Sequence, residues 1–143
     1  MAHAEALCAA RGQRLTPLRR QVLETLAGSH RTLGAYEIMD RMAGHGPRPA
    51  PITVYRALDF LLEQGLVHRI ESRNAFLACI GDHGEIEAAA TTVFLICERC
   101  GAVGETSSAA VAKTLQAAAR AAGFTPKARV IELTGFCAHC RKG

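Results

Sequence analysis

Four of the six cysteines stand in two Cys-x-x-Cys pairs, and this spacing constrains the fold more than any other feature of the chain. The first pair is Cys97 and Cys100, and the second is Cys137 and Cys140. Each pair can present two thiolates to one ion, and two pairs complete a closed tetrahedral shell of the kind that holds structural Zn²⁺. His139, inside the second pair, is an alternative ligand. We therefore expect a metal ion to fix the end of the chain to a turn far upstream.

The composition predicts a cytoplasmic protein that does not enter the membrane. The longest uncharged run, residues 88–97, is much shorter than the roughly 18 apolar residues of a membrane span. The first residues lack the basic segment and long apolar stretch of a secretory signal. Because disulfides are rare in the cytoplasm, the paired cysteines are interpreted as metal ligands rather than as a disulfide framework.

The first 80 residues predict helices followed by a two-stranded hairpin. Helices are expected near residues 5–10, 17–27, 35–43 and 51–64, and strands at 67–72 and 74–80. This order of elements is typical of a winged helix, in which the last helix before the hairpin, residues 52–64, enters the major groove. The apolar side chains at helical spacing are Val22, Leu23, Leu26, Tyr36, Ile38, Met39, Met42, Val54, Leu58, Leu61 and Leu62.

The remaining residues predict a second, smaller domain. A polar and alanine-rich connection, residues 81–91, is followed by strands at 92–97 and 103–106, a helix at 108–122 and a strand at 128–134. A unit of this size has little core of its own, so we expect it to need metal and dimerisation for stability. The predicted fold class is α+β: a winged helix-turn-helix DNA-binding domain over 1–80 and a small α/β dimerisation domain over 92–143.

A basic cluster follows the first predicted helix and continues into the start of the second. Residues 11–20 contain Arg11, Arg14, Arg19 and Arg20 with no acidic residue among them. Such a cluster attracts phosphate groups, although it is also common on a solvated helix face.

A second set of possible metal ligands is spread over both predicted domains. His68 and Cys79 fall on the two hairpin strands, His83 in the connection, and Glu105 just beyond the first cysteine pair. A surface histidine, a core thiol and a solvated carboxylate are the alternative interpretations. A site built from these residues would join the DNA-binding domain to the dimerisation domain. Binding of a metal ion could then set the angle between the two domains. Cys8 is interpreted as a buried helix residue.

Four sequence blocks resemble the ferric uptake regulator (Fur) family. They are RGQRLTPLRRQVLETL, APITVYRALDFLLEQGLVHRIESRNAFLAC, FLICERCGAVGE and GFCAHC, and the resemblance covers residues 8–140. The second block is similar to the zinc-responsive branch of the family. The resemblance implies a homodimer that binds palindromic operators in double-stranded DNA and represses zinc-acquisition genes when zinc is plentiful.

The resemblance also implies two zinc ions per monomer, one structural and one regulatory. The structural ion would be held by the four paired cysteines, and the regulatory ion by His68, Cys79 and Glu105. A family histidine, normally about seven residues before the first paired cysteine, is replaced here by Ala90. His83 is assigned as the fourth ligand, with Glu85 and Glu87 as alternatives. A shell that includes a thiolate favours Zn²⁺ over the metals of iron-sensing relatives.

The DNA-binding residues are assigned partly by the same resemblance. Thr53, Tyr55 and Arg56 belong to the TVYR tetrapeptide of the recognition helix. Arg56 is expected to bond guanine O6 and N7. Tyr55 would contact a thymine methyl or a phosphate, unless it is a core aromatic. The residues expected to position the DNA backbone are Arg14, Thr16 and Arg19.

Three other functions are considered. One is a family member that senses Fe²⁺, Mn²⁺ or peroxide, and another is a metal-independent DNA-binding protein with only a structural zinc. The third is an enzyme, which is disfavoured because a closed four-thiolate shell has no place for water and no catalytic triad or carboxylate pair is evident. We expect no small-molecule substrate and no membrane partner.

Overall fold

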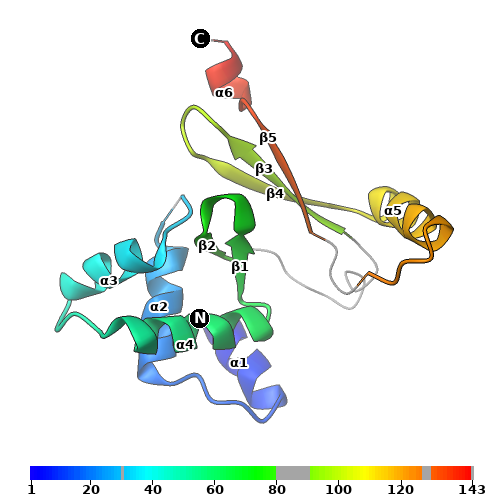
Figure 1. Cartoon of the computed structure of the whole chain (residues 1–143). Helices are drawn as coiled ribbons and strands as arrows, with labels where there is room; N and C mark the ends of the chain where they lie inside the picture. Colours follow the sequence, from blue (N-terminus) through cyan, green and yellow to red (C-terminus); the bar gives the residue numbers. More distant parts are fainter. Residues whose placement is uncertain (30, 80–90, 127–129, 143) are drawn as a thin grey trace. The chain divides into compact units, whose positions relative to one another are not determined.

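The structure is a computed structural model that describes residues 1–29, 31–79, 91–126 and 130–142. The chain forms two compact units, an N-terminal unit (Met1–Ile80) and a C-terminal unit (Gly81–Gly143). In Figure 1 the first is blue to green and the second is mainly yellow to red. The helices with a hairpin in the first unit and the mixed sheet of the second confirm the predicted α+β class.

Four helices build most of the N-terminal unit: α1 (Ala2–Ala10), α2 (Pro17–Ala27), α3 (Ala35–Ala43) and α4 (Pro51–Glu63). Local signals set where they begin. The Thr16 hydroxyl oxygen accepts a hydrogen bond from the Arg19 N–H at 3.4 Å and caps α2. Pro51 occupies the first turn of α4, where its missing N–H costs nothing.

The core of the N-terminal unit is aliphatic and lies where α2, α3 and α4 meet. Val22, Ile38, Val54 and Leu61 are completely buried, and Cys8 is 1% exposed, as predicted for a helix residue. Two expectations were wrong. Tyr36 was placed on the apolar face of α3 but is 61% exposed, and Leu62 is only half-buried, while Ala57 and Phe60 are buried in α4 instead. These errors arise because helical spacing allows a wider apolar stripe than the neighbouring helices cover.

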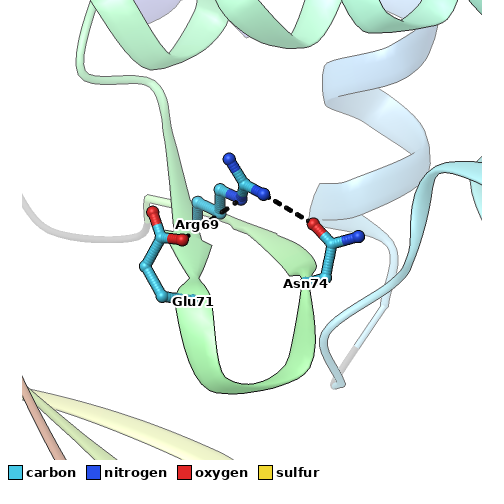
Figure 2. Close-up of polar contacts among 3 residues, drawn as sticks. All are labelled: Arg69, Glu71 and Asn74. Carbon is cyan, nitrogen blue, oxygen red and sulfur yellow. Dashed lines mark hydrogen bonds and ion pairs between the residues drawn. The ribbon is translucent and has the colours of Figure 1, made fainter.

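The hairpin, or wing, consists of β1 (Val67–Ile70) and β2 (Ala75–Ala78), shorter than the strands predicted. A 3₁₀ turn (Glu71–Arg73) joins them, and Asn74 adopts the left-handed conformation at φ 47°. Figure 2 shows the contacts across this turn: Arg69 donates a hydrogen bond to Asn74 Oδ1 at 2.7 Å and pairs with Glu71 at 3.7 Å.

Two backbone hydrogen bonds attach the wing to the rest of the N-terminal unit. The N–H of Leu33 donates to Phe76 O at 2.9 Å, and the N–H of Phe76 donates to Leu33 O at 2.8 Å. Both side chains are buried, so the wing is continuous with the helical core.

The C-terminal unit is a three-stranded sheet with a crossover helix. In chain order it contains β3 (Thr91–Cys97), β4 (Val103–Ser108), α5 (Ala109–Ala121), β5 (Val130–Gly135) and α6 (Ala138–Arg141). The central strand β3 pairs antiparallel with β4 and parallel with β5, and α5 supplies the crossover that a parallel pair requires. The predicted β-β-α-β order is confirmed, whereas the short helix α6 was not predicted.

The packing of this unit is thin. Phe94 at the centre of β3 is completely buried, but in α5 only Ala112 is. Apolar side chains on both α5 and the sheet remain exposed, among them Leu95, Leu115 and Leu133. Among the described residues of either unit, no helix is long and apolar enough to cross a membrane.

The conformation of Asn74 generates a stability prediction. Asn74→Ala should lower the free energy of unfolding by about 1–2 kcal/mol, because alanine tolerates the left-handed region poorly and cannot accept the Arg69 hydrogen bond. Asn74→Gly should cost less, since glycine adopts this conformation without steric strain. Urea denaturation of the full chain measures both variants. Equal losses for alanine and glycine would show that the backbone conformation is not what Asn74 provides.

Candidate metal centres and nucleic-acid interface

The sheet register brings the two cysteine pairs together. Cys97 ends β3 opposite Gly135 of the parallel strand β5. The segments that follow these two strands therefore leave the sheet at the same end. Cys100 lies in the turn that follows β3, and Cys137 and Cys140 lie at the start and within α6. The four sulfur atoms all lie within 4.8 Å of one another, and Cys100 Sγ and Cys137 Sγ are 3.9 Å apart.

Each pair is held in a tight turn. In the first, the Gly101 N–H donates to Cys97 O at 3.0 Å, and Gly101 has the positive φ of 75° that this reversal requires. In the second, the Cys140 N–H donates to Cys137 Sγ at 3.4 Å and starts α6. Arg99 braces the two turns, since its guanidinium donates to Cys140 O at 2.8 Å and lies 5.2 Å from the Phe136 ring centre.

Backbone amides aimed at sulfur favour the thiolate form at two positions. Hydrogen bonds from the Cys100 and Cys137 amides lower the pKa of the Cys97 thiol to about 6. The Cys140 amide likewise lowers the pKa of Cys137. Burial instead raises the pKa of Cys140 to about 12. Ionisation of Cys140 is therefore favoured by a positive charge nearby, which a bound cation would supply.

The geometry of the four-cysteine cluster fits Zn²⁺. A Zn–S distance of about 2.3 Å corresponds to a tetrahedral S–S edge of about 3.8 Å, close to the 3.9 Å between Cys100 and Cys137. Among the described residues, this candidate metal-binding group consists of the four cysteines and does not include His139. With four thiolates the shell is closed, so it offers no coordination position for a substrate.

His68 and Cys79 lie on one face of the wing. The register pairs His68 with Leu77, and the Cys79 N–H extends the ladder by donating to Leu66 O at 2.9 Å. Residues two apart on a strand point to the same side, so the imidazole and the thiol are diagonal neighbours. Their ligand atoms lie within 4.8 Å of each other, and both side chains are half-buried.

The other two residues of this predicted set belong to later parts of the chain. Glu105 is an exposed residue of β4 in the C-terminal unit, opposite Phe94. His83, like its alternatives Glu85 and Glu87, lies outside the described residues.

The predicted recognition helix, α4, presents polar and apolar side chains to solvent. Tyr55 is 42% exposed, so the interpretation of Tyr55 as a core aromatic was wrong, and Arg56 beside it is also exposed. The Thr53 hydroxyl donates to Ala50 O at 2.6 Å and is engaged at the helix start. Ile52, which the sequence reasoning did not single out, is 58% exposed. An isoleucine directly after the helix-starting proline was the available signal.

The basic cluster is largely occupied by contacts within the N-terminal unit. The Arg19 guanidinium lies 3.6 Å from the Phe60 ring centre and donates to Arg14 O at 2.6 Å. Arg11 donates to Gln64 O at 3.1 Å. Arg20 forms an ion pair with Glu5 of α1. Arg14 has an exposed side chain. The sequence reasoning did not anticipate these structural contacts.

Comparison with known proteins agrees with this architecture. The family model described as the ferric uptake regulator family matches residues 10–134. The chain is 41% identical over 140 residues to the zinc uptake regulation protein of Escherichia coli (strain K12), covering 98% of this chain and 80% of that protein.

Two solved structures are similar over nearly the whole chain. One is a zinc uptake regulator complexed with zinc and DNA, with a TM-score of 0.90 and 41% identity over 99% of this chain and 92% of that one. The other is holo XcZur, with a TM-score of 0.86 and 42% identity over 99% and 96% of the two chains. The extent of the family match and the identity to zinc uptake regulators lead to one conclusion: the chain belongs to the ferric uptake regulator family.

Proposed function

We propose that this chain is a zinc-responsive transcriptional repressor that uses Zn²⁺ as corepressor and binds palindromic operators of zinc-uptake genes as a homodimer. The observation that carries the proposal is the 41% identity, over 98% of the chain, to a zinc uptake regulation protein. The similarity to a regulator complexed with zinc and DNA supports the same function. It would act in the cytoplasm on double-stranded DNA, as a regulator and not an enzyme.

The division of labour follows the chain. Residues 1–80 would bind DNA, 81–91 would act as a hinge, and 92–143 would dimerise. The structural zinc, held by the four paired cysteines, would stabilise the thinly packed C-terminal unit by joining α6 to the end of β3. The exposed apolar side chains of α5 and the sheet support dimerisation, because a second copy would cover them.

The regulatory zinc is proposed to bind His68, Cys79, His83 and Glu105. The proximity of the His68 and Cys79 ligand atoms, within 4.8 Å on one face of the wing, supports this assignment. A thiolate beside an imidazole favours Zn²⁺ over Fe²⁺ or Mn²⁺, so sensors of those metals are less well supported. A zinc ion at the hinge need only shift the spacing between the two DNA-binding domains of the dimer. A typical allosteric coupling free energy of about 1–3 kcal/mol is enough for this.

DNA recognition is proposed to divide between two groups of residues. On the exposed side of α4, Arg56 would contact base edges, and Tyr55 would contact a thymine methyl or a phosphate. Arg14, Thr16, Arg19 and Thr53 would hold the phosphate backbone in register. Arg19 would act partly through Arg14, whose carbonyl oxygen it binds.

Loss of the Cys79 thiolate should separate sensing from folding. Cys79→Ser is expected to remain a dimer that binds one zinc per monomer instead of two, and its operator affinity should no longer depend on zinc. Metal analysis, sedimentation and operator titration with and without zinc measure the three properties. Cys8→Ala, which removes a buried thiol from α1, is the matched control and should keep the full zinc response. A Cys79→Ser protein that responds to zinc like the wild type would refute the regulatory site.

Cys97→Ala should instead disrupt the fold of the C-terminal unit. The variant removes a buried thiol at the end of β3, so the structural zinc should be lost and the C-terminal unit should unfold. Sedimentation should then report monomers. A stable dimer with undiminished zinc content would contradict the structural role of the cluster.

Alanine substitution of a base-contacting residue and of a phosphate-contacting residue should change DNA affinity in different ways. Arg56→Ala is expected to weaken operator binding by about 1–3 kcal/mol while leaving binding to scrambled DNA nearly unchanged. Arg14→Ala should weaken both about equally and reduce the salt dependence by about one phosphate contact. Titrations of both duplexes at several salt concentrations test this, and the reverse pattern would exchange the two assignments.

A further inference from the structure

We propose that Ile52 is a specificity-determining residue that recognises thymine through its C5 methyl group, beside the base contacted by Arg56. The inference rests on the proposed function, in which α4 is the helix that enters the major groove. It adds a residue outside the predicted DNA-binding set and names the chemical group that this residue recognises.

Packing within the chain does not account for Ile52. Other apolar side chains form the buried face of α4: Val54 and Leu61 are completely buried, and Leu58 is 1% exposed. Ile52 is instead 58% exposed, with a branched side chain whose rotation is restricted in a helix. A rigid apolar group is therefore presented to solvent at the start of the helix.

Its neighbours make this position part of the proposed DNA surface. Tyr55 and Arg56 follow Ile52 by three and four residues, the spacing at which helix side chains are adjacent on one face. Both are exposed, and the first turn of α4 contains no acidic residue. Recognition helices of this class contact base edges with their N-terminal residues, which is where Ile52 lies.

The chemistry of the side chain selects one base. In the major groove only thymine presents a methyl group, while the other bases present hydrogen-bonding groups there. An aliphatic side chain gains from contact with the methyl but would leave a cytosine amino group or a guanine oxygen without a partner. Thr53 is a poorer candidate for this contact, because it is half-buried and its hydroxyl donates to Ala50 O at 2.6 Å.

Deoxyuridine supplies a sharp test, because it differs from thymidine only by the missing methyl group. The probe is a duplex selected from a random library by the zinc-loaded wild-type dimer, with each thymine replaced singly by deoxyuridine. We expect one thymine in each half-site whose replacement weakens wild-type binding about fourfold, the value of one buried methyl group. Ile52→Ala should weaken binding to the unmodified duplex by at least as much, and replacement of that same thymine should then have no further effect.

Two further variants complete the experiment. Ile52→Val should retain part of the sensitivity to deoxyuridine, because it keeps the branched carbon. Glu63→Gln, an exposed change at the far end of α4, should keep all of it. If deoxyuridine weakens binding of Ile52→Ala by the same factor as binding of the wild type at every thymine, the inference is wrong. The repressor function would still stand. If zinc-loaded wild-type protein selects no duplex at all, the proposed function itself fails.

Discussion

The convergence of two Cys-x-x-Cys turns at one end of the β3–β5 pair is the constraint on which the C-terminal unit depends. The described residues of the unit include one completely buried aromatic side chain and a helix that buries a single alanine, so apolar packing alone provides little stability. In our proposal, a zinc ion bound by the four sulfur atoms would compensate by connecting the end of the chain to the central strand. Because amide hydrogen bonds lower the pKa of Cys97 and Cys137, part of the ligand shell is prepared for a cation by the backbone itself.

The wing links the two chemical roles that we propose for the N-terminal unit. His68 and Cys79 lie on one face of the hairpin, and its backbone is bonded to Leu33 within the helical core. A metal ion bound to that face would therefore act on a rigid body that includes α4, not on a separate flexible arm. Such rigidity is what a hinge-based sensor requires, since a small change at the ligands has to reach the reading helix.

Much of this fold could be predicted from the sequence, because particular residue types mark where its helices begin. Thr16 and Pro17 mark the start of α2, Gly34 precedes α3, and the cysteine spacing predicted that the four sulfur atoms lie together. Tyr36 was misassigned because periodicity cannot tell which part of an apolar stripe a neighbouring helix covers. The contacts of the arginines could not be predicted either, since they join distant segments, as Arg11 and Gln64 do across 53 residues.

The way the N-terminal arginines are used has a consequence for how the protein would find its target. The guanidinium groups of Arg11, which bonds Gln64, and of Arg20, which pairs with Glu5, are less available to displace the cations condensed on a DNA duplex. Affinity for arbitrary genomic DNA would then be modest, in keeping with a net charge of only +4. A regulator with this balance spends little time on the many wrong sites, so a small number of operators can be occupied without a large pool of protein.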